Sequence, residues 1–338
     1  MTKHILQSQA WNDFQRNIGR KTFYKEAKDY SYLAILEQTK LGNYLFVPYG
    51  PAADTKKGQK AGILALKELA THEKAIFVRI EPLFPLSETD QKDLNLQKTK
   101  DIEPKYTRII DLTRPEEEIL ADIEKRKVRY WRNYAKKGIS IEISKNPTDF
   151  DALYDFYTAI SKTNNFATHD KKYLKAQFKQ NFTKLYVARY ENQPIAAYLI
   201  YDDENTRYFT HGGADYEHRN LAAGTILVIQ MILDAKKSGQ KSFDMWGVCG
   251  TDDKNDPWYG FTSFKNAFGG QQVEFAGTYD LPIDTKKYRI YKNLRKINRI
   301  KRKILKKEPK NPKISRKGRF FVNHRIFLDR TSGFYLYQ

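Results

Sequence analysis

Hydrophobic residues in the first eighty positions follow the spacing of strands and then that of a helix. Residues 30–38 and 44–54 carry strand-like apolar runs, and the second run ends in a turn. Residues 58–73 place apolar side chains every three or four positions, as one face of a helix does, and residues 75–82 form a further apolar run. The pattern predicts the order strand, strand, helix, strand.

The same order occurs a second time. Residues 184–204 read as two alternating strands around the turn sequence Glu-Asn-Gln-Pro, and residues 207–217 read as a strand that ends in glycines. Residues 221–239 are so apolar that a helix there must be largely buried, and residues 241–248 read as the next strand. The chain therefore contains a weak internal repeat of one β-β-helix-β unit.

This unit is the core arrangement of acyl-CoA N-acyltransferase-like (GNAT) folds. We therefore expect an α/β (α+β) protein with two tandem GNAT-like domains, in which helices flank mixed sheets. The first domain is expected at residues 1–138, completed by the segment 276–338, and the second at residues 139–275. A basic helical segment at residues 285–319 completes the expected organisation.

One apolar helix face carries a charged group. Phe261, Phe264 and Phe268 are spaced as one face of a helix, and Lys265 lies on the same face just before a Gly-Gly pair. Such a lysine either packs its stem and extends its ammonium group into solvent, or presents that group to a ligand. The position alone favours neither interpretation.

The net charge of +20 is concentrated in one segment. Thr285 to Arg319 holds 17 Lys and Arg residues and one acidic residue, Glu308, whereas residues 1–284 hold 41 basic and 38 acidic residues. Such a block favours a polyanionic partner, either nucleic acid or an acidic membrane surface. A solvated, solubilising tail is the alternative.

Composition excludes several classes of protein. Cys249 is the only cysteine, so a disulfide framework or a cysteine-based zinc site is excluded. The first residues lack the apolar core of a signal peptide, and no stretch approaches the roughly 18 apolar residues of a membrane span. We therefore expect a cytoplasmic protein.

Two stretches suggest contacts with phosphate groups. Residues 124–138 read as a helix with seven basic residues and a shared aromatic face, which fits either a phosphate-binding surface or an amphipathic linker. Arg219, Ala222 and Gly224 form an R-x-x-A-x-G turn. A similar turn binds the pyrophosphate of acetyl-coenzyme A in N-acetyltransferases, although its first glycine is an alanine here.

The common catalytic motifs are absent. The sequence has no G-x-S-x-G elbow, no H-E-x-x-H motif and no Walker A pattern, and its six histidines are scattered. We therefore expect neither a metal nor a cofactor. An enzyme that only aligns an activated ester with an amine needs neither a metal nor a covalent nucleophile.

Seven marks in order resemble the Fem-type (FemABX) peptidyltransferases. They cover most of residues 5–284 and include QSQAW (7–11), VPYGP (47–51), VRIEP (78–82), AKKG (135–138), THGGAD (210–215), FDMWGV (243–248) and FKNAFGGQQVEFAGTYDLP (264–282). No long helical arm interrupts residues 140–260, so the resemblance is to the compact, FemX-like form. The family consists of two acetyltransferase-like domains, as the internal repeat also predicts.

The resemblance implies a reaction. Members of the family move an amino acid from aminoacyl-tRNA onto a peptidoglycan precursor and so build interpeptide bridges. This chain would then transfer an amino acid to the stem-peptide amine of UDP-MurNAc-pentapeptide or lipid II, with aminoacyl-tRNA as co-substrate and no cofactor. It would act as a cytoplasmic monomer, and a peripheral contact with the anionic inner face of the membrane stays open.

The resemblance also implies residue roles. Lys265 falls on the family's F-K lysine, which is implicated in transfer, and Glu81 falls on an aspartate suspected of acid/base or positioning work. The implied substrate-binding residues are Gln15, Arg16, Arg79, Thr168, Lys171, Tyr173 and Phe264. A phosphate-binding arginine of the family is replaced by Asp170 or Lys171, which leaves open how a UDP-linked precursor is held.

Basic residues on two helices are the expected tRNA contacts: Arg126, Arg129, Arg132, Lys136, Lys296, Arg299 and Lys303. The second helix is predicted near residues 286–307, since apolar residues recur there at steps of three and four. We expect its apolar stripe to dock on the first domain and its charges to face tRNA. An anionic membrane is the alternative partner; tRNA comes first because every version of the reaction needs it.

Two alternatives to this function remain. The same fold could carry a coenzyme-A-dependent N-acyltransferase of the GNAT superfamily, which binding of coenzyme A would support. The chain could also be a non-catalytic module that binds tRNA or membrane through its basic segment. Binding of RNA or liposomes without any transfer from charged tRNA would favour that interpretation.

Overall fold

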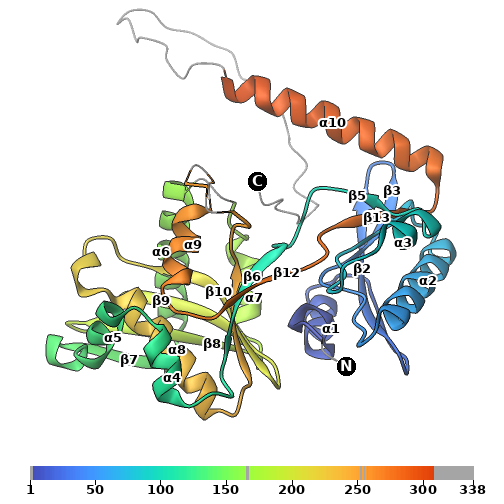
Figure 1. Cartoon of the computed structure of the whole chain (residues 1–338). Coiled ribbons are helices and arrows are strands. Elements are labelled where there is room, and N and C mark those ends of the chain that lie inside the picture. Colours follow the sequence, from blue (N-terminus) through green and yellow to red (C-terminus); the bar gives the residue numbers. More distant parts are fainter. Residues whose placement is uncertain (1–2, 165–166, 252, 255, 257, 308–338) are drawn as a thin grey trace, which may run out of the picture.

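Two sheets form two lobes that lie side by side (Figure 1). The computed structural model describes residues 3–164, 167–251, 253–254, 256 and 258–307, with the side chains of residues 164 and 299–307 outside the description. Helices flank both sheets, and each sheet contains parallel and antiparallel pairs. The predicted fold, two mixed sheets of the GNAT-like kind, is therefore confirmed.

The first lobe is built on a sheet of six strands. Their order is β1 (Thr22–Glu26), β2 (Ser31–Thr39), β3 (Gly42–Val47), β4 (Phe77–Ile80), β13 (Tyr279–Pro282) and β5 (Gln97–Lys98). Helix α2 (Lys56–His72) connects β3 to β4, the one parallel pair of this sheet, and α1 (Gln9–Asn17) and α3 (Glu88–Asp93) complete the lobe. The strand, strand, helix, strand order predicted for residues 30–82 is confirmed.

The second lobe is built on a sheet of seven strands. Their order is β12 (Gln271–Glu274), β6 (Tyr106–Asp111), β11 (Ser242–Gly247), β10 (Thr206–Ala214), β9 (Gln193–Asp202), β8 (Thr183–Tyr190) and β7 (Ile139–Ser144). Helix α8 (Ala223–Lys237) connects β10 to the parallel strand β11. Glu191 and Asn192 have positive φ at the predicted turn between β8 and β9, so the second copy of the unit is confirmed as well.

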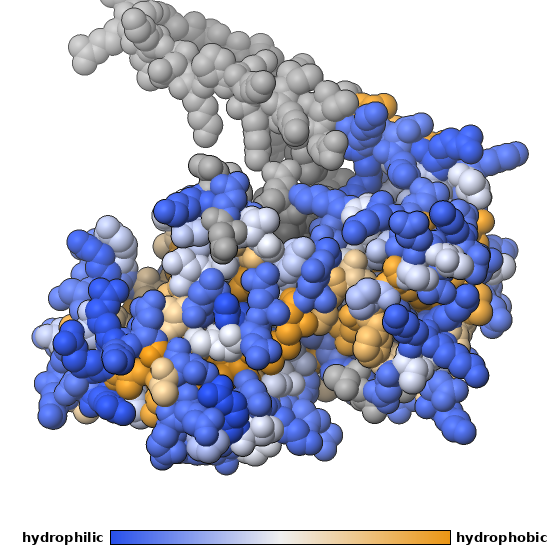
Figure 2. Space-filling view, viewed as in Figure 1, coloured by the Kyte–Doolittle hydropathy of each residue, from blue (hydrophilic) through white to orange (hydrophobic). Residues whose placement is uncertain are grey.

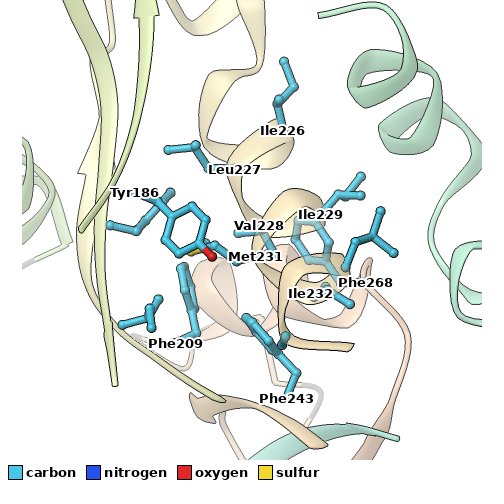
Figure 3. Packing of buried hydrophobic residues seen from close by; sticks show 14 of the residues in the cluster. Tyr186, Phe209, Ile226, Leu227, Val228, Ile229, Met231, Ile232, Phe243 and Phe268 are labelled. Carbon is cyan, nitrogen blue, oxygen red and sulfur yellow. The ribbon is translucent and has the colours of Figure 1, made fainter. Parts of the chain in front are cut away.

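Alternate residues of β8 pack on opposite faces of the second sheet. Tyr186 and Ala188 belong to the core under α8, together with side chains of α4 (Glu116–Asp122) and α5 (Lys125–Arg132). Leu185 and Val187 belong to the core under α6 (Pro147–Asn164) and α7 (Lys171–Phe178). Figure 3 shows the apolar side chains of α8 converging on Phe209, Phe243 and Phe268. The apolar helix predicted at 221–239 is thus largely buried because the sheet, α5 and α9 (Tyr259–Asn266) surround it.

The two lobes share part of their core. Trp11 and Phe14 of α1 are buried, and the Trp11 ring lies 5.6 Å from the ring of Tyr201 on β9. These residues belong to the same hydrophobic cluster as the side chains under α6 and α7. Helix α1 therefore joins the first lobe to the second sheet.

Sheet membership differs from the expected division of the chain. Strand β6 lies before the expected boundary at residue 138, yet it pairs with β11 and β12 in the second sheet, and α4 and α5 pack on that sheet. The cause is long-range pairing, which a short alternating strand does not reveal in its own sequence. Strand β13 lies in the first sheet between β4 and β5.

Helix α10 (Thr285–Lys307) extends from the first lobe (Figure 1), close to the predicted range. The expectation that its apolar stripe docks on the first domain is wrong for the described residues, because Ile290, Leu294 and Ile297 are exposed. The helix contacts the first lobe through Tyr288, which packs on Phe77 and donates a hydrogen bond to Asp280. Among the described helices, none combines the length and hydrophobicity that crossing a membrane requires. Pro309 and Pro312, expected to end the helix, lie outside the described residues.

Candidate active site

A bulge in β11 forms the floor of the candidate site. The pairing of β11 with β6 shifts register between Asp244 and Gly247, and Trp246 within the bulge has φ 59°. This left-handed conformation is rare for a large side chain and is often found at functional sites. The Trp246 amide donates a 2.7 Å hydrogen bond to Oδ1 of Asp244, which stabilises the bulge.

Gly247 is required by the close approach of two neighbours. A Cβ atom at this position would lie 2.5 Å from the ring of Trp258 and 2.7 Å from Cγ of Pro104. Both distances are far below a normal contact, so only glycine fits. Pro104 belongs to the segment that connects the two sheets, and the bulge therefore lies where the second lobe meets that connection.

Lys265 points its ammonium group into this bulge. It lies on α9 (Tyr259–Asn266), and its Nζ donates a 2.7 Å hydrogen bond to the carbonyl oxygen of Gly247. Phe268, one turn further on, is fully buried, and Phe264 packs against it at 5.1 Å between ring centroids. The phenylalanine stripe therefore packs as predicted, and it directs the lysine inward instead of into solvent.

Burial brings the pKa values of two opposite charges together. Burial lowers the pKa of Lys265 to about 8, and the charge of Asp244 opposes this shift. Burial also raises the pKa of Asp244 to about 6, against hydrogen bonds from Thr107 and Trp246 and the charge of Lys265. Each group can therefore gain or lose a proton near neutral pH at a small cost in free energy. This property suits acid–base catalysis or electrostatic stabilisation.

Lys265 borders a cavity of about 600 Å³. Phe264, Trp246 and His211 line it, and so does the start of α8 from Ala222 to Thr225. The R-x-x-A-x-G turn opens this helix as predicted, with Ala222 in the left-handed conformation at φ 57°. The cavity thus combines a positive helix end, a buried cation and aromatic walls, which are groups that suit an anionic or ester-bearing ligand.

A row of polar rings continues from the cavity toward the first lobe. Nε2 of His211 lies 2.9 Å from the hydroxyl of Tyr201, and its ring lies 5.2 Å from that of His169. The next ring, that of Tyr173, lies 5.3 Å from His169, and its hydroxyl accepts a 3.2 Å hydrogen bond from Nε2 of Gln15 on α1. Gln15 and Tyr173, both predicted substrate contacts, therefore meet across the two lobes.

Glu81 lies behind the cavity wall and does not line it. Its Oε1 accepts hydrogen bonds from the amides of Ile102 (3.2 Å) and Glu103 (2.9 Å) and from the hydroxyl of Thr278 (2.7 Å). Its Oε2 is buried and has no hydrogen-bond partner among the described residues. Glu81 therefore holds the connection that presents Pro104 to the cavity.

Glu103, which the sequence interpretation did not single out, contacts Glu81 through its amide and directly precedes Pro104, a residue of the cavity lining. Burial and the neighbouring charge of Glu81 raise the pKa of Glu103 to about 8, and burial raises the pKa of Glu81. Two carboxyl groups in this arrangement favour holding a shared proton. A signal was present, because the tripeptide Ile-Glu-Pro occurs at residues 80–82 and again at 102–104.

Other expected substrate contacts lie away from the cavity. The Arg79 guanidinium is buried and binds both carboxylate oxygens of Asp280, at 2.7 and 2.8 Å. Arg16 is exposed, and exposed Lys171 forms a 2.9 Å ion pair with Asp151. Thr168 is half-buried in the segment before α7. The structure brings together only Lys265 with Phe264, and Gln15 with Tyr173.

The basic helix of the second lobe is anchored by its aromatic face. Trp131 Nε1 donates a 3.0 Å hydrogen bond to Oε1 of Gln230 on α8, and a short 3-10 turn follows α5 and ends at Gly138. The four basic residues expected to contact tRNA are exposed here: Arg126, Arg129, Arg132 and Lys136. Lys296 is exposed on α10, whereas the side chains of Arg299 and Lys303 lie outside the description.

The two lobes of mixed sheets flanked by helices define a fold of the GNAT-like class. Comparison with known proteins narrows this class. Residues 161–296, which contain the bulge, α8 and Lys265, match the model of the FemAB family. Over these residues the chain is similar to the Fem-type family, as the sequence marks predicted.

Three relatives describe the match. A lipid II:glycine glycyltransferase of Staphylococcus saprophyticus is 28% identical over 101 residues, which cover 30% of this chain and 24% of that protein. The aminoacyltransferase FemA of Staphylococcus epidermidis is 25% identical over 143 residues, or 40% of this chain and 34% of that protein. The matches therefore span between a quarter and a third of these relatives. The crystal structure of FemX shares the fold, with a TM-score of 0.75 and 16% identity over 85% of this chain and 94% of that one.

Proposed function

We propose that this chain is an aminoacyltransferase that moves an amino acid from aminoacyl-tRNA to the stem-peptide amine of a peptidoglycan precursor. The family match and the names of two relatives, a lipid II:glycine glycyltransferase and an aminoacyltransferase, support this class of reaction. The observation that carries the proposal is the buried ammonium group of Lys265 at the edge of the cavity.

The reaction forms one bond and breaks another. The acceptor amine attacks the carbonyl carbon of the aminoacyl ester, so that a C–N bond forms, and the ester C–O bond then breaks to release the 3′ oxygen of tRNA. Negative charge develops on the carbonyl oxygen and then on the leaving oxygen. Lys265, with a pKa near 8, is protonated at neutral pH and can stabilise either oxygen or donate a proton to the second.

The acceptor amine must lose a proton before or during attack. A lysine amine with an ordinary pKa of about 10.4 is almost fully protonated at pH 7.4. In this proposal the Glu81–Glu103 pair takes up that proton indirectly, because Glu81 lies behind the cavity wall, and the raised pKa values of both carboxyl groups favour the uptake. Glu81 also acts through position, since it holds the segment that carries Glu103 and Pro104.

The basic face of α5 supports the same donor. Arg126, Arg129, Arg132 and Lys136 are exposed on the lobe that carries Lys265, so phosphates of a tRNA acceptor stem could contact them while its 3′ end enters the cavity. The basic residues of α10 stand beside an exposed apolar row, which favours a different partner.

Mass spectrometry tests this function directly. The full chain is incubated with lipid II or UDP-MurNAc-pentapeptide and a mixed pool of aminoacyl-tRNAs. We expect the precursor to gain the mass of one amino-acid residue, and to gain nothing when the tRNA is deacylated. Modification of an amine by acetyl-coenzyme A, with none from charged tRNA, would instead establish the coenzyme-A-dependent alternative.

A further inference from the structure

Helix α10 presents a row of large apolar side chains to solvent. Ile290, Leu294 and Ile297 are 50%, 44% and 47% exposed. At about 100° per residue, their spacing of four and three places them within an arc of about 60°. Six large hydrophobic side chains are exposed in the described part of the chain, and half of them lie in this single row.

A separate face of α10 anchors the helix to the first lobe. Tyr288 is buried, its ring lies 5.2 Å from Phe77, and its hydroxyl donates a 2.9 Å hydrogen bond to Asp280. Tyr291 lies 4.9 Å from the same phenylalanine ring. The apolar row is therefore not needed for docking, and Figure 2 shows hydrophobic colour along α10 among its polar surface.

Basic side chains surround this row. Residues 285–307 hold 12 Lys and Arg residues and no acidic residue. In the described part, four of these basic side chains are exposed beside the row or on the neighbouring face: Lys286, Lys287, Arg289 and Lys296. The helix thus offers one polyanion-binding face and one apolar face side by side.

We propose that α10 is an interfacial helix that lies on an anionic lipid surface. Ile290, Leu294 and Ile297 enter the boundary between head groups and acyl chains, and the flanking basic residues contact lipid phosphates. A lipid surface satisfies both faces of the helix. This proposal does not depend on the aminoacyl transfer, and either can fail alone.

Charge argues against the other occupants of the apolar row. RNA phosphates would match the basic residues but would leave the row in water. A second copy of α10 would bring the same positive charge to the contact, and like charges repel. Residues 308–338 of this chain hold seven basic and two acidic residues, so they offer no complementary charge either.

Vesicle sedimentation of the full chain tests the proposal. We expect binding to vesicles with phosphatidylglycerol and phosphatidylcholine, and at least tenfold weaker binding to phosphatidylcholine alone. Ile290→Ser/Leu294→Ser/Ile297→Ser should weaken binding to the anionic vesicles at least tenfold. The matched control Leu64→Ser/Ile143→Ser changes exposed apolar residues elsewhere and should stay within twofold. Wild-type binding by the triple variant would overturn the proposal.

A fluorescent dye attached within the apolar row of α10 provides a second test. It reports the surroundings of the row itself, so a general loss of folding would not be mistaken for a loss of lipid contact. Cys249 is buried, so Leu294→Cys in a Cys249→Ser background offers one exposed thiol for an environment-sensitive dye. We expect its emission to shift to the blue with anionic vesicles and to stay unchanged with tRNA. A blue shift with tRNA, or with rising protein concentration in the absence of lipid, would assign the row to RNA or to a second copy. No shift with vesicles would exclude lipid insertion.

Discussion

Buried Arg79 in the first lobe and half-buried Lys265 in the second are two cations with opposite surroundings. Arg79 makes two hydrogen bonds to Asp280, and Tyr288 donates a further bond to the same carboxylate. This pairing raises the pKa of Arg79 despite its burial. Lys265 makes one hydrogen bond, to a carbonyl group, and burial lowers its pKa to about 8 beside an open cavity.

We infer from this difference that Arg79 contributes to the stability of the protein and that Lys265 contributes to the reaction. The Arg79–Asp280 pair is buried, makes its charge-assisted hydrogen bonds within the protein and does not line the cavity, so we infer a structural role for it. Among the described residues, Lys265 has one hydrogen-bond acceptor, the carbonyl oxygen of Gly247, so its ammonium group retains donors for a ligand in the cavity. Although both residues match marks of the same family, we expect their substitution to affect different properties of the protein.

Arg79→Met should cause the largest loss of stability. Removing one partner leaves the buried Asp280 carboxylate without its counter-charge, which typically costs about 3–5 kcal/mol. Urea unfolding followed by circular dichroism measures the loss, and Arg16→Met, at an exposed arginine, provides the control. A loss below about 1 kcal/mol would remove the structural assignment and restore the predicted substrate contact.

Asp244→Asn should change the pH dependence of transfer. Without the charge of Asp244, the pKa of Lys265 falls further below 8, so less of the lysine is protonated at neutral pH. In the wild type, activity that requires protonated Lys265 is present below pH 8 and is lost above it. We expect the variant to lose activity about one pH unit earlier, so that it is about threefold slower at pH 7.5 and about tenfold slower at pH 9. An unchanged pH–rate profile would show that the charge of Asp244 does not influence the pKa of Lys265.

Glu81→Gln and Glu103→Gln should have smaller effects, about three- to tenfold on the rate constant for transfer. If the pair accepts the amine proton, the rate constant falls more than substrate binding weakens. If Glu81 only positions the segment before Pro104, the apparent substrate constant rises and the rate constant is retained. Initial rates over a range of precursor concentrations distinguish the two outcomes.

The same pair predicts a modest pH dependence of stability. Both carboxyl groups have raised pKa values, so the folded state binds more protons than the unfolded state between about pH 4.5 and 8. The free energy of unfolding should therefore fall as pH rises through this window. Glu103→Gln should reduce that fall by about 1 kcal/mol, measured by urea unfolding at pH 5 and pH 8. An equal fall in the variant would contradict the shared-proton interpretation.

The sequence revealed those features whose signal is local. The helix at 221–239 and the strands around it follow from apolar spacing, and the phenylalanine stripe around Lys265 follows from the same rule. Features that depend on distant partners were not predictable in this way. Strand β6 pairs with β11 more than 130 positions away, and Arg79 pairs with Asp280 across 201 positions.

The surroundings of Lys265 could not be predicted from the sequence pattern either. The bulge at Trp246 turns one carbonyl group toward Lys265, and that turn depends on backbone conformation at a residue that rarely adopts it. The apolar row of α10 was recognised as a helical stripe, but whether it packed on the first lobe depended on which face Tyr288 would anchor. Local spacing predicts the stripe and not its partner.

The central claim is that Lys265 serves aminoacyl transfer and not stability. Lys265→Met tests it best, with Lys127→Met as the matched control, because the ammonium group of Lys127 lies over the rings of the same two residues, Phe264 and Phe268, at 5.4 and 5.3 Å, without lining the cavity. Transfer to the precursor and urea unfolding are measured on the same preparations at pH 7.5. We predict that Lys265→Met lowers transfer at least a hundredfold while its free energy of unfolding stays equal or rises by about 1 kcal/mol, since a buried charge is removed. Lys127→Met should retain transfer within about threefold. Transfer by Lys265→Met within about threefold of wild type would contradict the account.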